Sequence, residues 1–184
     1  MVDADNFNVN ITNNVSLVKL TGKHFFLNLL EKKEPIVFSS LKRNRAYRLF
    51  EFEDILQYVT VPHSAFGTPN PCGGGRTEVV ELFNWLEIKN VKTMVYVQVQ
   101  DSQTTAHTDQ AIVESLSRFN VEILDWRKAD LCPLTIREAC TGKLRVLHLC
   151  WTGGNAKLVA WGGLEGLANL SHLTDVYLDL KTVG

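Results

Sequence analysis

Strand and helix signals alternate between residues 77 and 180, and this alternation restricts the fold more than any other feature of the sequence. The strands are expected at 93–100, 121–124, 146–150 and 176–180, and the helices at about 77–89, 108–119, 133–140 and part of 156–170. Parallel strands need a crossover connection, which a helix usually supplies. We therefore expect a compact α/β fold with a mainly parallel sheet and helices packed on it.

Short internal matches accompany the alternation. The pattern L-x-x-L-x-L occurs at 144–149 and again, with Val at its second apolar position, at 173–178, while segment 121–126 matches 146–151. This spacing is similar to that of leucine-rich repeats. Two or three irregular copies are too few for a solenoid, so we expect weak repeat-like βα units in the C-terminal half of a compact sheet.

The N-terminal part, residues 1–61, has a different pattern. Apolar residues alternate with polar ones in several short runs, which predicts extra strands before the regular βα region. One segment, about 22–31, places Phe25, Phe26, Leu29 and Leu30 at helical spacing and predicts a helix. A pair of antiparallel strands is expected over 47–52 and 55–61.

Segment 62–76 separates the two patterns and holds three of the five prolines and four of the twelve glycines. This composition predicts a long loop. Loops of this length inside a domain are often functional, so we expect a lid or a mobile wall here. A chain of 184 residues suits one domain. We expect residues 1–61, the loop and a βα part over 77–184 to form it together.

The bulk composition limits the partners. With 19 Lys and Arg against 20 Asp and Glu, the net charge is -1, which argues against nucleic acid as a partner. No run approaches the ~20 apolar residues of a membrane span, and the polar N-terminus does not resemble a signal peptide. The four cysteines form no C-x-x-C pair and suit reduced thiols. We expect a cytoplasmic protein without a membrane span.

Motifs for hydrolysis, metal binding and nucleotide binding are missing from the sequence. There is no G-x-S-x-G nucleophile elbow, and the five histidines are scattered. The glycines at 73–75 precede a helix, but no P-loop lysine follows them, so a flexible loop is the better interpretation. We expect neither a metal nor a cofactor.

Two polar residues follow strand 93–100, at the edge of the sheet where α/β proteins bind ligands. Asp101 and His107 are therefore candidate catalytic residues for acid–base chemistry. The alternative is that Thr108 and Asp109 cap the next helix while His107 lies in a surface loop.

The remaining candidates lie on the strands or are aromatic. Tyr96, His148 and Tyr177 are candidate catalytic hydrogen-bond donors, although a strand histidine is more often a core or interface residue. Aromatic side chains suit the walls of an apolar pocket, and core packing is the alternative for each of them. The candidate substrate-binding residues are Trp126, Trp151, Trp85 and Phe66.

Three stretches are distinctive as letter strings. They are FNWLEIKNVKTMVYVQVQD at 83–101, HTDQAIVESLSRFNVEILDWRKADLC at 107–132, and LRVLHLCWTGGNAKLVAW with GLEGLANL at 144–170. Together they resemble the non-catalytic module of fungal intracellular subtilisin-like proteins, over about half of the chain. The protease domain of those proteins and its Asp, His and Ser are absent from this sequence. The resemblance therefore implies ancestry and a fungal source rather than proteolysis.

Two functions fit a module of this kind without its protease. One is a protein-interaction or regulatory module that recognises another protein through a sheet edge or an exposed face. The other is a cofactor-independent cyclase, of the pericyclase or Diels–Alderase kind, in natural-product biosynthesis. Such an enzyme needs an apolar pocket and a hydrogen bond that polarises a carbonyl. The long loop and four tryptophans favour the cyclase, so the expected partner is an apolar small molecule, with a protein partner or homo-oligomer as alternatives.

Overall fold

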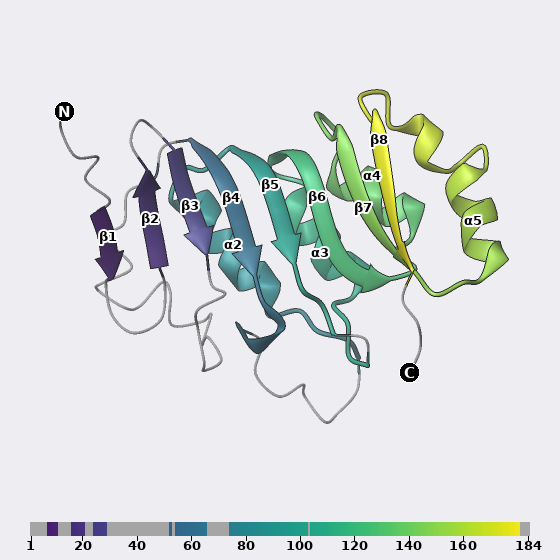
Figure 1. Cartoon of the computed structure of the whole chain (residues 1–184), viewed down its shortest axis with the longest axis horizontal. Helices are drawn as coiled ribbons and strands as arrows, with labels where there is room; N and C mark the ends of the chain where they lie inside the picture. Colours follow the sequence, from purple (N-terminus) through teal and green to yellow (C-terminus); the bar gives the residue numbers. More distant parts are fainter. Residues whose placement is uncertain are drawn as a thin grey trace.

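The computed structural model describes residues 7–10, 16–20, 24–28, 52, 54–65, 74–102 and 104–180, the first three ranges as backbone only. Its central feature is an eight-stranded sheet whose strands lie side by side in chain order (Figure 1). The strands are β1 (Phe7–Asn10), β2 (Ser16–Leu20), β3 (His24–Asn28), β4 (Ile55–Val61), β5 (Thr93–Val99), β6 (Asn120–Ala129), β7 (Val146–Trp151) and β8 (Asp175–Leu180).

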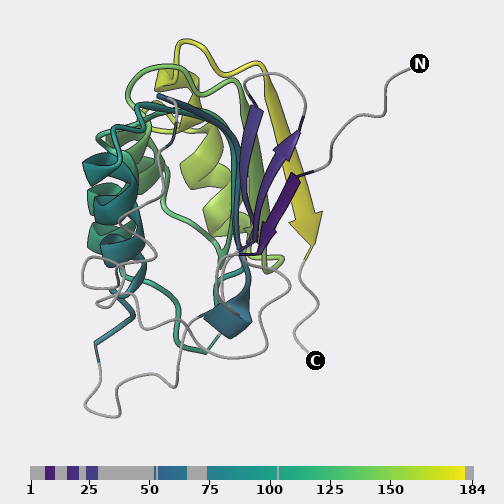
Figure 2. The same cartoon turned by 90° about the vertical axis from the view of Figure 1, so that its left-hand side faces the viewer.

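The helices lie on one face of this sheet (Figure 2). They are α2 (Val79–Ile88), α3 (Asp109–Leu116), α4 (Pro133–Ala139) and α5 (Asn155–Gly162), with short 3-10 turns η2 (His63–Ala65) and η3 (Leu167–Asn169). Figure 2 shows these four helices on the same side of the strands. This follows from the strand order, because consecutive right-handed crossovers between adjacent parallel strands all pass over the same face.

Strands β4 to β8 are parallel to one another, so the α/β fold with a parallel sheet that the sequence predicts is confirmed. The elements after residue 76 lie within a few residues of their expected bounds, apart from β6, which extends to Ala129. At the other end of the sheet β1, β2 and β3 pair antiparallel, and β3 pairs in parallel with β4.

The hydrophobic core lies between the parallel strands and the helices. One row of it runs across the sheet through Val59, Val97, Leu124 and Leu147, which are paired in register and have no exposed surface. Helix α2 buries Val79, Leu82, Phe83 and Leu86, at the spacing of one helix face. Full burial of one such side chain contributes about 1.5–3 kcal/mol, so this layer dominates the stability of the fold.

The observed register agrees with one internal match and differs from the other. Leu147 pairs with Val176 and Leu149 with Leu178, as the match between 144–149 and 173–178 requires. The match between 121–126 and 146–151 is displaced by two residues, because Val146 pairs with Ile123. A bulge between Asp125 and Ala129 then shifts the register by a further two residues, so that Ala129 pairs with Cys150.

In the N-terminal part, one expected element differs from the structure and another lies mostly outside the described residues. The helix over 22–31 is wrong, because His24–Asn28 forms strand β3, and pairing with strands on both sides outweighs the local helical spacing. Most of segment 47–52 lies outside the described residues. Strand β4 has β3 and β5 as its neighbours, both parallel to it.

The end of the glycine-rich segment is fastened to the connection between β5 and α3. The Arg76 amide donates to the Ala106 carbonyl oxygen, and the Thr108 amide donates to the Arg76 carbonyl oxygen, both at 3.0 Å. Gly75, with φ of +39°, lies directly before this pair of bonds. A β-carbon at Gly75 would lie 2.5 Å from the Thr108 methyl group. That methyl group is held in place because Thr108 Oγ1 caps α3 by accepting from the Ala111 amide at 3.1 Å.

We expect Gly75→Ala to lower the free energy of unfolding by about 2 kcal/mol, through the left-handed backbone and the clash with Thr108. The matched control is Gly74→Ala, at φ of +106° with no atom within 4 Å of the added carbon. Its cost should be only about 1 kcal/mol, from the backbone alone. Urea unfolding of the two variants measures the difference, and equal costs would contradict the close contact with Thr108.

Candidate functional site

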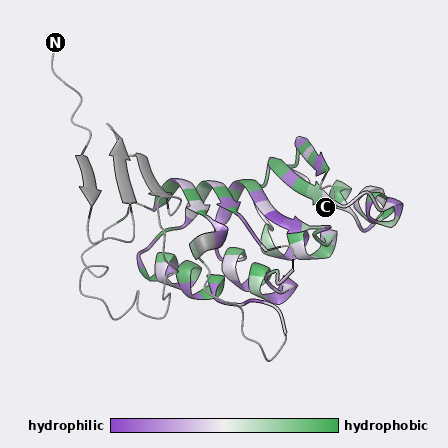
Figure 3. Ribbon diagram, turned by 60° about the horizontal axis from the view of Figure 1, so that its bottom comes forward, coloured by the Kyte–Doolittle hydropathy of each residue, from purple (hydrophilic) through white to green (hydrophobic). Residues whose placement is uncertain are grey.

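The face of the sheet opposite the helices carries two rows of paired side chains, which we call the open face. The first row is Tyr58, Tyr96, Ile123, Val146 and Asp175, and the second row is Thr60, Gln98, Asp125, His148 and Tyr177. Tyr58 is 44% and Tyr177 53% exposed, although both belong to paired strands. Figure 3 shows how polar and apolar residues are interleaved along these strands. Successive strand residues point to opposite faces, so the same strands supply both the core and the open face.

A buried carboxylate forms the centre of the open face. Asp125 Oδ2 accepts from Gln98 Nε2 at 2.8 Å and from the Tyr96 hydroxyl at 3.3 Å. Arg127 donates to the same carboxylate through Nε at 3.1 Å and Nη2 at 3.1 Å. The Asp125 side chain is only 3% exposed. Its charge is therefore neutralised and its oxygens are occupied before any ligand arrives.

The pKa values of the groups around Asp125 reflect this arrangement. Burial, followed by the negative charge of Asp125 and the hydrogen bond to it, raises the pKa of the Tyr96 hydroxyl. The hydrogen bonds to Asp125 raise the pKa of the Arg127 guanidinium, and the nearby charge of Asp179 acts in the same direction. Tyr96 is thus neutral and donates its hydroxyl hydrogen bond to Asp125, and Arg127 remains a cation.

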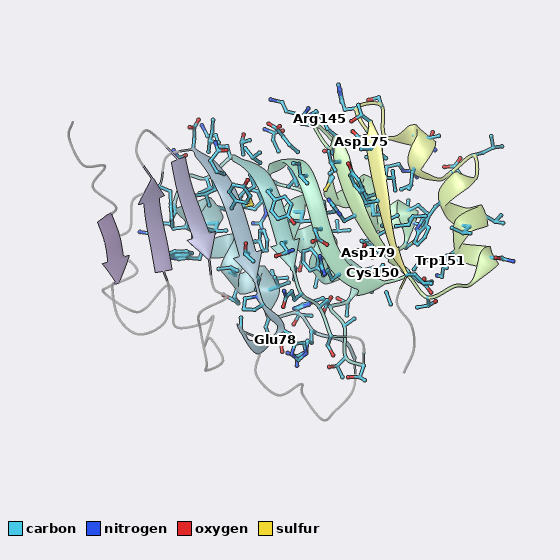
Figure 4. The ribbon with its side chains drawn as sticks, viewed as in Figure 1. Glu78, Arg145, Cys150, Trp151, Asp175 and Asp179 are labelled. Atoms are coloured by element: carbon cyan, nitrogen blue, oxygen red, sulfur yellow. The ribbon has the colours of Figure 1, made fainter. Side chains whose placement is uncertain are left out.

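Aromatic pairs flank this polar centre on both sides. The rings of Tyr58 and Tyr96, on β4 and β5, have centroids 5.5 Å apart. On β7 and β8 the rings of His148 and Tyr177 stack, with centroids 4.8 Å apart and an interplanar angle of 16°. Charges lie beyond the second pair: Arg145 and Asp175 at the amino ends of β7 and β8, and Asp179 at the carboxyl end of β8 (Figure 4).

Asp101 and His107, the two candidates at the carboxyl end of β5, are in contact. Asp101 Oδ1 accepts from His107 Nδ1 at 2.9 Å, and Asp101 Oδ2 accepts from the His107 amide at 3.0 Å. The Trp126 indole Nε1 donates to Asp101 Oδ2 at 2.9 Å. Burial alone would raise the pKa of the Asp101 carboxyl group. The hydrogen bonds and charge of His107, together with the bond from Trp126, outweigh burial and hold this pKa below its usual value.

The cluster is buried and brings together the loop between β5 and α3, strand β6, and Glu78 just before α2. The side chains of Asp101 and His107 have no exposed surface, and Trp126 is fully buried. His107 Nε2 lies 4.0 Å from Glu78 Oε2, and the His107 carbonyl oxygen accepts from Lys128 Nζ at 2.8 Å. The arrangement positions the loop between β5 and α3 against β6, and Thr108 caps α3 as the alternative interpretation of this loop expects.

The other sequence candidates lie in different places. Tyr96, His148 and Tyr177 share the open face, away from Asp101 and His107 on the carboxyl edge. Trp85 is 2% exposed on α2 and contacts Phe52 edge to face. Trp151 ends β7 half-buried and donates from Nε1 to the Gly154 carbonyl oxygen at 3.1 Å. Phe66 and most of the long loop lie outside the described residues. The catalytic and substrate-binding roles stay predictions.

Sequence reasoning missed the polar centre of the open face. Gln98, Asp125 and Arg127 hold it together, and none of them was a candidate. A signal was present, because residues two apart on a strand share a face. Asp125 and Arg127 therefore had to point the same way as Ile123, opposite to Leu124 and Trp126.

Two hollows are described on the surface, and both are open. One, of about 140 Å³, lies beside Arg137, Cys140 and His172, where burial raises the pKa of the Cys140 thiol to about 12. The other, of about 370 Å³, lies between α2 and α3 beside Asn84 and Arg118. Neither is lined by the open face or by the candidates from the sequence.

Within the described ranges, no three His, Cys, Asp or Glu side chains are gathered where they could hold a metal ion. Among the helices of the same ranges, none has the length and apolar character needed to cross a membrane. Comparisons with protein families, with curated proteins and with solved structures find no match to this chain.

Proposed function

We propose that the chain is a non-catalytic interaction module that binds another protein on the open face. One observation carries the proposal: aromatic and hydrogen-bonding side chains from five parallel strands are aligned on the face that the helices leave uncovered. The resemblance of residues 83–170 to a non-catalytic module points in the same direction. Among the described residues, the thiols of Cys132 and Cys140 support a cytoplasmic location.

The residue types on the open face suit a protein interface. Tyrosine and arginine are enriched among the residues that dominate binding energy, because they bury large surfaces and keep polar ends that form hydrogen bonds. Tyr58 and Tyr177 supply exposed apolar area at the two sides. Burial of Asp125 beneath a partner leaves no unpaired carboxylate, because Tyr96, Gln98 and Arg127 already satisfy it.

Shape and charge favour a protein over other ligands. A small molecule needs a concave site that encloses most of its surface, and the hollows described above lie elsewhere. Nucleic acid needs a basic surface. The open face instead combines Arg127 with three carboxylates, those of Asp125, Asp175 and Asp179, and Arg145 lies at the amino end of β7 (Figure 4). Asp179, at the carboxyl end of β8, suits a partner with a basic group near that end.

The test compares two surfaces of the same protein. We expect Tyr58→Ser with Tyr177→Ser to reduce the recovery of a specific partner at least about tenfold, because two aromatic contacts are lost. The matched control is Ile88→Ser with Leu134→Ser, which removes two apolar side chains of similar exposure (65% and 45%) from the helices. Quantitative mass spectrometry of proteins bound to the wild type and to both variants gives the readout. Equal loss in both variants, or in neither, contradicts the proposal.

The cofactor-independent cyclase remains a second candidate, supported by the hydrogen-bonding side chains of Tyr96, His148 and Tyr177 on one surface. Tyr96 is the least available of the three, because its hydroxyl donates to Asp125. An apolar polyene bearing a carbonyl is the appropriate probe. Its turnover by the wild type, lost in Tyr177→Phe, would favour the cyclase over the interaction module.

A further inference from the structure

The last strand of the sheet has an unusual outer edge. In the part of the chain that the structure describes, β8 pairs with β7 on one side and with no strand on the other. All six of its residues are exposed, including Val176 at 41%, Leu178 at 47% and Leu180 at 62%. These apolar residues share one face of the strand, while Asp175, Tyr177 and Asp179 share the other.

Proteins usually protect such an edge from pairing with another chain. An edge strand exposes unpaired amide and carbonyl groups, and proteins protect it with lysine, proline, a bulge or a covering element. Strand β8, DVYLDL, contains neither lysine nor proline, and both of its charges lie on the open-face side. Helix α5, at the same end of the molecule (Figure 1), adds Val159, which is 72% exposed. An added strand would pair the free edge and reduce the exposed apolar area.

We propose that the outer edge of β8 binds the β8 of a second copy of this chain, antiparallel, about a two-fold axis perpendicular to the sheet at Leu178. Leu178 then faces Leu178 of the second copy, and Val176 faces Leu180, so apolar residues meet apolar residues on the helix side. On the open-face side Tyr177 faces Asp179, and a phenol hydroxyl donates to a carboxylate. The strand is complementary to itself in this register, as a two-fold interface requires.

The neighbouring registers are less favourable. An axis at Tyr177 places Asp175 opposite Asp179, and an axis at Asp179 places this residue opposite itself, so like charges face each other in both. A shift by one residue pairs Tyr177 with Leu178, which sets the open face of one copy beside the helix face of the other. Charge and side-chain pattern thus select the register centred on Leu178.

The two-fold axis has a consequence for the open face. Because it is perpendicular to the sheet, it keeps the helices of both copies on one side and both open faces on the other. The parallel strands of the two copies then form one continuous sheet with two identical binding surfaces. This inference does not depend on the proposed function, since the pairing follows the edge of β8 and shares only Tyr177 and Asp179 with the proposed binding surface.

The oligomeric state of the full chain tests the proposal. We expect sedimentation to give the mass of two chains for the wild type. Leu178→Lys should raise the dimer dissociation constant about a hundredfold, because two lysines replace the central apolar pair. Ile88→Lys places the same charge on α2, at a residue 65% exposed, and should remain dimeric. Circular dichroism establishes that each variant is folded. A wild type that stays monomeric at every concentration overturns the proposal.

Cross-linking tests the register separately and does not depend on a disruptive variant. With oxidised glutathione, Leu178→Cys should form a disulfide between two copies, because residue 178 lies directly opposite itself. Asp179→Cys should not link to itself, since the two positions are offset along the strands beyond disulfide reach. Peptide mass spectrometry separates these links from those of the native cysteines. Linking of Asp179→Cys as efficient as that of Leu178→Cys contradicts the register.

Discussion

Asp101→Asn is expected to lower the free energy of unfolding by about 3 kcal/mol, although the two side chains have the same shape. Both carboxylate oxygens of Asp101 accept hydrogen bonds from groups that are themselves buried. Oδ1 accepts from His107 Nδ1 at 2.9 Å, and Oδ2 accepts from Trp126 Nε1 at 2.9 Å. Asparagine offers one acceptor oxygen, so in either orientation its NH2 group points at an N–H donor, either Trp126 Nε1 or the Ser102 amide, which donates to Oδ1 at 2.8 Å. Thermal and urea unfolding measure the loss.

The same variant should change how stability depends on pH. The pKa of Asp101 is lower in the folded chain than its ordinary value of about 3.9. Its contribution to stability is therefore complete above that value and is lost as the pH falls through the lower, folded pKa. The stability difference between the wild type and Asp101→Asn should be constant near neutral pH and should shrink progressively below about pH 4.

Asp109→Asn is the matched control for Asp101. The Asp109 side chain is 50% exposed and forms a surface ion pair with Lys128. Its loss should change stability by no more than about 1 kcal/mol. If Asp101→Asn were as mild as Asp109→Asn, the cluster around His107 would not hold the loop between β5 and α3. The acid–base role predicted from the sequence would then become the better account of Asp101.

Trp126→Ala should have the largest effect of any single change considered, about 4 kcal/mol of unfolding free energy. The side chain has no exposed surface and belongs to the hydrophobic core. Its ring stacks on Phe83, with centroids 6.5 Å apart, and meets His107 edge to face at 5.9 Å. Removal of the ring leaves a cavity that the surrounding strands and helices fill only in part.

Trp126→Phe separates packing from hydrogen bonding. Phenylalanine keeps much of the apolar contact but removes the indole N–H that donates to Asp101, so its cost should be about 1–2 kcal/mol. Trp151→Phe is the control, because that tryptophan is half-buried and donates to the Gly154 carbonyl oxygen rather than to a buried carboxylate. Urea unfolding gives all three values. A Trp126→Ala variant of nearly wild-type stability would instead support the substrate-binding role that the sequence suggested.

The regular part of the fold was predictable because its signals are local. Apolar periodicity changes from two to about 3.6 at each boundary after residue 76, and Thr108 and Pro133 mark two helix starts. The segment around β3 was not predictable in this way. Its apolar spacing suits a helix, and only the pairing of β3 with β2 and β4 decides for a strand. Pairing with other strands cannot be inferred from the pattern within a window of ten residues.

The candidate site was predictable in its parts but not in its arrangement. Asp101 and His107 were expected at the same edge of the sheet because both follow the same strand, and the structure places them in contact. Asp125 was missed because its environment depends on register between strands. The sequence match aligned Asp125 with Cys150, whereas the observed pairing of β6 with β7 places it opposite His148. Because the sequence match differs from the observed register of β6 and β7 by two residues, it did not predict the polar centre of the open face.

Strand order that follows chain order also has evolutionary consequences. Within the described sheet, each of β4 to β7 pairs with the strands that come just before and just after it in the chain. A duplicated helix–strand unit could therefore be inserted between two strands without changing the order of the other strands, as in repeat proteins. Each such unit would add one further strand, with its outward side chains, to the open face. The span of the recognition surface would then grow by gene duplication, and its chemistry by point substitution.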